Sequence, residues 1–195
     1  EKHSLSVTDV CWSSTNSFLL SVSFDRTVKL WDVAAGKLLQ SLDIGSTPSA
    51  AVFEPPQNQC FYVGTQDRRL LCYDMRSPAA LAYSFSHEAA ITTLRVDDSG
   101  QIVYSGDAEG SIAAWSRQGL VAQMLNEASR RPITCVDTNC LKDGDKETCR
   151  YLCVNSYDNV LRLYSRRHDA PPAMDPAAGL QSVYELVHEV GLYCF

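Results

Sequence analysis

The sequence of 195 residues predicts an all-β fold in which one four-stranded antiparallel sheet occurs four times. Residues 7–42 hold four short runs of alternating apolar and polar residues, and turn residues separate these runs. Such a run ends on an aromatic residue at four places, at steps of 42, 42 and 49 residues, and an acid stands six positions before each aromatic. The aromatics are Trp31, Tyr73, Trp115 and Tyr164, and the acids are Asp25, Asp67, Glu109 and Asp158.

Four strands are expected in each sheet, because β-branched and aromatic residues alternate with polar ones between turns rich in Gly, Asp and Ser. One such sheet cannot cover both of its own faces, so the copies are expected to stack. The expected strands are residues 7–12, 18–23, 27–31 and 37–42, then 49–53, 60–65, 70–73 and 81–85, then 91–96, 101–106, 111–116 and 120–125, and finally 133–138, 151–156, 160–165 and 182–187.

A histidine marks the start of two units, because His3 and His87 each precede the tryptophan of their unit by 28 residues. With a period near 42, an acid in the second turn and Trp31-Asp32 at a strand end, the sequence resembles the WD40 repeats of a β-propeller. The resemblance implies blades at residues 3–42, 47–87, 87–125 and 130–187, with 188–195 starting a fifth. Since such propellers usually have about seven blades, we expect part of a seven-bladed ring.

The resemblance also implies a buried hydrogen-bonded set in the first blade. Its members are His3, Asp25, Trp31 and a serine of the second strand, Ser21 or Ser23, because a buried imidazole and carboxylate satisfy one another. Corresponding positions in the other blades are Asp67, His87, Glu109, Trp115 and Asp158. A remote alternative takes His3, Asp25 and Ser23 as a hydrolase triad.

Composition narrows the classes of partner. The formal net charge is −6 and the pI is near 5.1, which disfavours nucleic acid as the default partner. No apolar run is long enough for a membrane span, and no Gly-rich phosphate loop or metal-spaced histidine pair occurs. We therefore expect other proteins as partners, no membrane, cofactor, metal or small-molecule substrate, and an intracellular location in nucleus or cytoplasm.

Four of the eight cysteines stand in a C-x4-C-x8-C-x3-C pattern, Cys135, Cys140, Cys149 and Cys153. This pattern leaves a zinc site open as an alternative. Buried strand positions explain the strand cysteines more simply, since an unpaired cysteine behaves as a small apolar residue.

The expected function is a non-catalytic protein-interaction scaffold, with two candidate partner-binding regions. Tyr73, Asp74 and Arg76 end a run that is similar to the box by which some WD40 proteins dock on the cullin-4 ubiquitin ligase adaptor, so a substrate receptor is the alternative. The fourth blade carries expected loops at residues 139–149 and 166–180, which the propeller fold would place on one face. Candidate contacts there are Lys142, Asp143, Arg166, Arg167 and His168.

Overall fold

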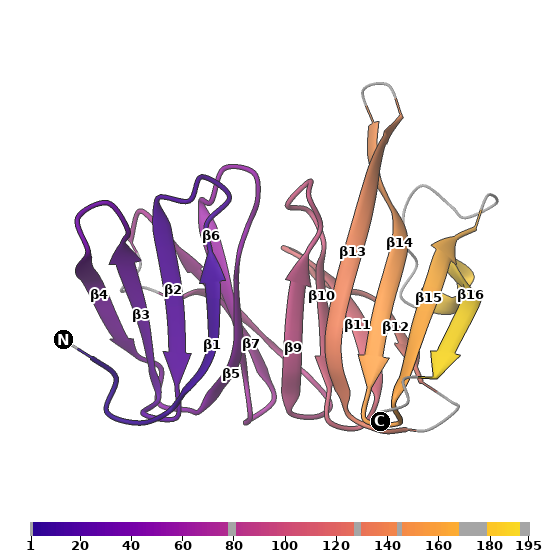
Figure 1. The fold of residues 1–195 in the computed structure, drawn as a ribbon, viewed down its shortest axis with the longest axis horizontal. Helices are drawn as coiled ribbons and strands as arrows, with labels where there is room; N and C mark the ends of the chain where they lie inside the picture. Colours follow the sequence, from indigo (N-terminus) through magenta and orange to yellow (C-terminus); the bar gives the residue numbers. More distant parts are fainter. Residues whose placement is uncertain (1, 78–80, 127–129, 144–145, 168–178, 192–195) are drawn as a thin grey trace. The chain divides into compact units, whose positions relative to one another are not determined.

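The computed structural model describes residues 2–77, 81–126, 130–143, 146–167 and 179–191, and it gives only the backbone of residues 140–143 and 146–149. The described chain is all-β (Figure 1). Its elements are β1 (Val7–Trp12), β2 (Phe18–Ser23), β3 (Thr27–Asp32), β4 (Lys37–Asp43), β5 (Pro48–Phe53), β6 (Cys60–Thr65), β7 (Arg69–Asp74), β8 (Leu81–Ser86), β9 (Ile91–Val96), β10 (Val103–Asp107), β11 (Ser111–Ser116), β12 (Gly119–Leu125), β13 (Ile133–Asp143), β14 (Lys146–Ser156), β15 (Val160–Arg166), the 3₁₀ turn η1 (Leu180–Ser182) and β16 (Tyr184–Gly191).

The strands form four sheets of four strands each, and within every sheet the strands follow chain order, β1-β2-β3-β4, β5-β6-β7-β8, β9-β10-β11-β12 and β13-β14-β15-β16. Short connections join successive strands within each sheet except β15 and β16, and such connections favour antiparallel neighbours. The prediction of a repeated four-stranded antiparallel sheet is therefore confirmed. The described residues include no helix long and apolar enough to cross a membrane.

The chain divides into two compact units, residues 1–94 and 95–195. In the first unit, alternate side chains of β2 and β3 pack with alternate side chains of β6 and β7. The rings of Phe61 and Tyr73 stack there with their centroids 5.2 Å apart. Burial of each large apolar side chain contributes about 1.5–3 kcal/mol, so this core is the main stabilising feature of the unit.

Polar side chains also join the first two sheets. Thr8 donates through Oγ1 to the carbonyl of Pro48, at 3.1 Å, and the Asp9 carboxylate accepts the backbone N–H of Ala51, at 3.0 Å. Burial raises the pKa of Asp9, although its two backbone hydrogen bonds oppose the rise. These hydrogen bonds fix the position of β1 against β5, because apolar packing alone would let the two strands slide past each other.

The core of the second unit joins its third and fourth sheets. Tyr104, Ile112 and Leu152 are fully buried in it, and Leu180 of η1 covers one side. The hydroxyls of Tyr104 and Tyr184 lie 3.1 Å apart, so two buried polar groups satisfy each other.

The turn between the second and third strands has the same backbone form in all four sheets. The residue after each expected acid has a positive φ, between 60° and 86°, at Arg26, Arg68, Gly110 and Asn159. The left-handed conformation suits Gly and Asn and costs other residues energy. The two arginines are therefore held there by their surroundings.

The expected loop at residues 139–149 is largely β-structure, which corrects the sequence interpretation. β13 and β14 extend as a hairpin past the other strands of their sheet (Figure 1). In the register, Lys142 is opposite Glu147, and Asp143 is opposite Lys146. The segment that was expected to form a loop therefore continues as two paired strands.

The same register bears on the zinc alternative. Cys140 is opposite Cys149, whereas Cys135 is opposite Asn155 and Cys153 is opposite Asp137. Five residues of strand separate Cys135 from Cys140, a distance of about 17 Å at the usual rise per residue. The four thiolates therefore cannot bind one zinc ion, and the described residues contain no cluster of three or more metal-ligating side chains.

The end of the chain departs from the expected boundaries. β16 continues to Gly191, and His188 is paired with Leu163 inside it, four residues before the position at which a fifth blade was expected to begin its first strand. Residues 192–195, the expected strand, lie outside the described residues, as do residues 168–178 of the second insertion.

Candidate functional site

A chain of hydrogen bonds crosses the first sheet from Trp31 to Asp25. The indole Nε1–H of Trp31 donates to Ser21 Oγ at 2.9 Å, and Ser21 Oγ lies 2.7 Å from His3 Nε2. His3 Nδ1 lies 3.0 Å from Asp25 Oδ2. A carboxylate only accepts, so Nδ1 carries the proton, and the Ser21 hydroxyl donates to Nε2. The four side chains form one directed chain.

The Asp25 carboxylate is nearly buried, with 7% of its side chain exposed, and it accepts four hydrogen bonds. Oδ1 accepts the backbone N–H of Thr27 at 3.0 Å and its hydroxyl at 2.6 Å, and Oδ2 accepts the N–H of Ser4 at 2.9 Å in addition to His3. Burial alone raises the pKa of Asp25, but these four bonds together lower it well below its ordinary 3.8. The carboxylate is therefore ionised and holds the turn together.

Ser21, and not Ser23, is the serine of this set. Ser23 Oγ donates to the carbonyl of Leu5 at 3.2 Å and accepts the N–H of Asp25 at 3.1 Å, so Ser23 supports the turn instead. The hydrolase alternative named the wrong serine. Ser21, His3 and Asp25 do have the connectivity of a catalytic triad, but Ser21 is 5% exposed and its oxygen already accepts the Trp31 N–H.

The third sheet repeats half of this arrangement. Trp115 Nε1–H donates to Ser105 Oγ at 2.8 Å, as Trp31 does to Ser21. The buried acid of the turn is Asp107, whose Oδ1 accepts the N–H groups of Glu109 at 2.9 Å and Ser111 at 2.8 Å. Glu109 itself is exposed, so its expected place in the set is wrong.

Asp107 lies eight residues before its tryptophan, at the position of Ser23 in the first sheet. The carboxylate of this turn therefore stands two positions earlier in the repeat than Asp25 does, and it still caps the turn between the second and third strands. His87 is 8% exposed, and its ring Nδ1 accepts the N–H of Ala89 at 3.5 Å. A link from His87 to Trp115 stays a prediction.

In the second sheet the aromatic is Tyr73, which has no indole N–H, and the serine position is the apolar Val63. Asp67 instead pairs with Arg69, whose NH2 lies 2.6 Å from Oδ2, and both side chains are about 40% exposed. Burial raises the pKa of Asp67, but its hydrogen bonds, first among them that from Arg69, lower it to about 2. This exposed pair stabilises the fold less than the buried set does.

The fourth sheet replaces the set by a buried arginine. Arg162 is 4% exposed, and its NH2 lies 2.7 Å from Asp158 Oδ2 while its Nε donates to Glu189 Oε1 at 2.8 Å. Its NH1 donates to Ser156 Oγ at 3.1 Å. Burial lowers the pKa of Arg162, but the two carboxylates outweigh this effect and raise it. Asp158 thus has the expected turn position, where it also accepts the N–H of Val160 at 3.1 Å.

Sequence reasoning missed Arg162. It stands two residues before Tyr164, and the same position holds Lys29, Leu71 and Ala113 in the other sheets. The signal in the repeat alignment was a cation, in the first and fourth sheets, at a position that holds leucine or alanine in the second and third.

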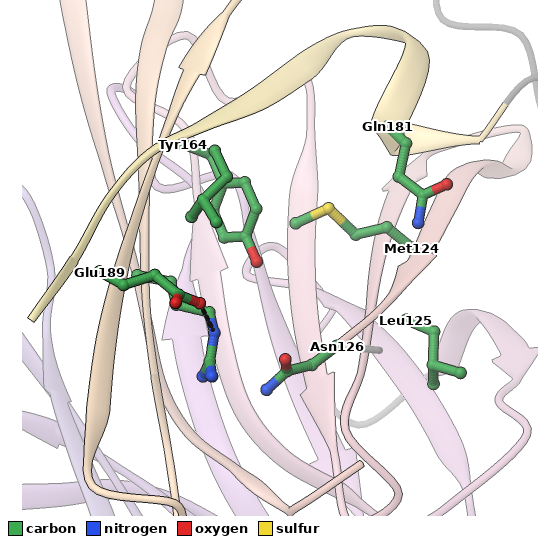
Figure 2. Close-up of a pocket in the computed structure, with 8 residues that line it drawn as sticks. Met124, Leu125, Asn126, Tyr164, Gln181 and Glu189 are labelled. Atoms are coloured by element: carbon green, nitrogen blue, oxygen red, sulfur yellow. Dashed lines mark hydrogen bonds and ion pairs between the residues drawn. The ribbon is translucent and has the colours of Figure 1, made fainter. Parts of the chain in front are cut away.

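A pocket of about 180 Å³ lies next to Arg162, within the second unit (Figure 2). Strand β12 and the turn η1 line one side, and β15 and β16 line the other. Figure 2 shows the Tyr164 hydroxyl and the Asn126 amide directed toward the same space, with Met124 and Glu189 at its sides. The lining residues are Met124, Leu125, Asn126, Arg162, Tyr164, Gln181, Leu186 and Glu189.

Comparison with known proteins agrees with this geometry. The family model for the WD domain, G-beta repeat, matches residues 1–32 and 80–116, the first two segments in which a histidine precedes a tryptophan. The β-propeller domain of Myceliophteria thermophila Cps50 (Swd1) superposes with a TM-score of 0.74 at 18% identity, covering 98% of this chain and 61% of that one. Two segments of the chain thus match the WD-repeat model, and its fold is similar to that of a β-propeller domain.

The chain is also similar in sequence to two named proteins. Pre-mRNA-processing factor 17 of Saccharomyces cerevisiae is 27% identical over 150 residues, which are 75% of this chain and 31% of that protein. Protein Rae1 of Drosophila melanogaster is 30% identical over 108 residues, 51% of this chain and 31% of that protein. The chain therefore spans less than a third of the length of these WD40 relatives.

The candidate docking box ends the third strand of the second WD40 blade. Tyr73 is 7% exposed and belongs to the core, whereas the Arg76 side chain is 81% exposed. Arg76 Nε donates to Asp74 Oδ1 at 3.0 Å, and its NH2 lies 2.5 Å from Oδ2. Of the three residues, only Asp74 and Arg76 reach the surface, where they form an ion pair with each other.

The insertion residues of the fourth blade are less completely described. Arg166 is the last residue of β15 and is paired with Tyr184 in the register, and the Arg167 N–H donates to the carbonyl of Val183 at 2.8 Å. Lys142 and Asp143 lie on β13 near the hairpin tip. His168 lies outside the described residues.

Proposed function

We propose that this WD40 chain is a non-catalytic scaffold that binds other proteins. The observation that carries this proposal is that the side chains with the connectivity of a catalytic triad lie below the surface and are hydrogen-bonded to one another. His3, Asp25 and Ser21 satisfy one another beneath the surface, and Trp31 occupies the serine oxygen. The polar groups of the repeat thus support the blades, which leaves the exposed turns and edges for recognition.

Two exposed aromatic residues support recognition at the turns. Phe24 is 48% exposed and Tyr157 is 72% exposed, and each directly precedes the acid of its turn, in the first and fourth blades respectively. Large aromatic side chains are enriched among residues that dominate binding energy between proteins.

A photo-crosslinking amino acid at Phe24 or Tyr157 of the full-length protein, expressed in cells, tests the scaffold. We expect each site to capture a defined protein, and the equivalent turn residue of the second blade, Gln66, to serve as the matched control. Purified chain should remain unlabelled by a fluorophosphonate. Labelling that Ser21→Ala abolishes would establish the hydrolase alternative and overturn the scaffold.

A second candidate is the substrate receptor of a cullin-4 ubiquitin ligase, docking through Tyr73–Arg76. The sequence resemblance carries it, and the exposure of the paired Arg76 guanidinium favours it. Arg76→Ala in the full-length protein should then lose the adaptor in a pulldown, while Arg68→Ala in the same blade should retain it. Retention by both variants would remove this candidate.

We infer a location in the nucleus or cytoplasm, and proteins as partners before nucleic acid. The net charge of −6 supports the choice of partner, and the name pre-mRNA-processing factor, borne by a relative, supports the location. Fractionation of cells that express the tagged full-length protein checks the location. Recovery only from the medium would contradict it.

A further inference from the structure

The pocket beside Arg162 exists because a charged side chain occupies a core position. The equivalent residue of the second blade, Leu71, packs fully into the core of its unit. Arg162 needs hydrogen-bonding partners instead, and Asp158, Ser156 and Glu189 supply them. Glu189 comes from β16, so this edge of the blade interface is polar and is not closed by apolar side chains.

The charges around the pocket do not cancel. Arg162 and Glu189 line the pocket with one positive and one negative charge, and Asp158, which pairs with Arg162 but does not line the pocket, adds a second negative charge. This cluster of three side chains therefore carries a net charge of −1. All three side-chain nitrogens of Arg162 are already engaged, NH2 and Nε by these carboxylates and NH1 by Ser156. An anion would therefore meet an excess of negative charge, whereas a cation would restore neutrality.

Polar groups of the lining are also open to a ligand. Within the described part of the chain, the Tyr164 hydroxyl has no hydrogen-bond partner, and Glu189 Oε2 has none either. Burial raises the pKa of Tyr164, so its hydroxyl stays protonated. This hydroxyl can donate one hydrogen bond and can accept others through its lone pairs. The Glu189 side chain is 45% exposed, which places its free oxygen at the mouth.

The remaining wall is apolar. Met124 is 5% exposed and Leu186 is 49% exposed, and both line the pocket. A volume of about 180 Å³ is below the roughly 300 Å³ at which small-molecule and cofactor sites begin. It suits a single side chain with an apolar stem and a charged end, as lysine and arginine have.

We propose that this pocket binds one basic side chain, a lysine or arginine, of a partner protein. The stem contacts Met124 and Leu186, and the cationic end is held by Glu189 and the Tyr164 hydroxyl. The proposal rests on the proposed scaffold function, because it names the chemistry by which one partner is recognised.

The test is a titration of the 195-residue chain, labelled with ¹³C in the methionine methyl groups. The probes are the N-acetyl amides of lysine and arginine, with those of norleucine and glutamate as uncharged and anionic comparisons. We expect the Met124 resonance to shift and saturate with at least one basic probe, and with neither comparison. Met75, in the first unit, should stay unchanged.

Variants separate the pocket from general effects. Glu189→Gln should weaken binding of the basic probe about tenfold, because it removes the charge that the cation meets. Tyr164→Phe, which keeps the ring, should weaken it about threefold. Glu185→Gln makes the same charge change on β16 at a residue that does not line the pocket, and it should bind as the unaltered chain does. Equal melting temperatures establish that each variant folds.

Equal shifts with norleucine, tighter binding of glutamate, or unchanged affinity in both pocket variants would overturn the proposal. These outcomes leave the scaffold intact, because crosslinking at Phe24 and Tyr157 does not depend on the pocket. Conversely, saturable binding of a basic probe by a chain that captures no protein would contradict the scaffold alone.

Discussion

Asp25 is the single residue on which the first blade depends most, because its carboxylate joins the turn to His3. We expect Asp25→Asn to lower the free energy of unfolding by about 1.5–3 kcal/mol near neutral pH, the range for hydrogen bonds to a charged group. The folded-state pKa is lowered, so this contribution is complete above the unfolded value of 3.8 and is lost as the pH falls below it.

Urea unfolding of both chains between pH 7 and pH 3 measures the effect. The difference between them should stay constant down to about pH 5 and shrink below the unfolded pKa. Asp67→Asn is the matched control in the second blade, and it should cost less than about 1 kcal/mol because its pair with Arg69 is exposed. Equal losses in the two variants would contradict the assignment.

Single residues also show how far sequence reasoning reached. The spacing of an acid before an aromatic placed Asp25 and Asp158 correctly at their turns, because that spacing reflects strand length. It selected Glu109 in place of Asp107, since a turn N–H can donate either to a carboxylate that stands earlier in the chain or to one in the turn itself. It left Ser21 and Ser23 both open for the hydrogen-bonded set, because both positions hold serine and only the face on which Trp31 lies distinguishes them.

At the scale of elements, the left-handed residue of each second turn gives a direct prediction. Arg26 has a φ of 66°, where a residue with a Cβ is strained, and we expect Arg26→Gly to raise the stability by about 0.5–1 kcal/mol. Gly110→Ala should do the reverse and cost more, because its φ is 86° and the added Cβ would lie 2.9 Å from the Arg131 carbonyl oxygen. Thermal unfolding of the two variants measures both changes, and a loss of stability in Arg26→Gly would show that its side chain has a role.

The fourth blade shows why insertions are harder to predict than strands. The four core strands were predictable from alternation, but the charged ends of β13 and β14 were not, because polar residues without alternation give no signal for strand and pair only in one register. Arg162 was missed for a similar reason. Its burial depends on Glu189, which is 27 residues away in the sequence.

The second insertion carries a prediction about partners. We expect deletion of residues 169–178 from the full-length protein to remove at least one captured protein while the blades stay folded, because loops held by rigid sheets are frequent binding elements. Closing a shorter connection changes the folding entropy only slightly, so stability should fall by less than about 1 kcal/mol. Quantitative crosslinking at Tyr157 compares the partners, and an identical set from a folded variant would assign these residues no part in binding.

At the scale of the whole molecule, repetition was the predictable feature, because a sheet with two apolar faces requires a neighbour on each. The first blade meets the second with one face, through Leu20, Val22 and Phe61. Its other face carries Val10 and Trp12, which are 56% and 54% exposed. We therefore expect the 195-residue chain to associate with itself as its concentration rises. Burial of exposed apolar surface contributes a favourable free energy of about 25 cal/mol per Å².

Sedimentation velocity over a hundredfold range of concentration tests this expectation. The double variant Val10→Thr, Trp12→Gln should associate about tenfold more weakly, because it makes the exposed face polar and leaves the strand register of β1 unchanged. Leu120→Gln, which alters one exposed apolar residue (41%) on β12, is the matched control and should associate as the unaltered chain does. A compact monomer at every concentration would contradict the prediction and would indicate that the four blades cover their own faces.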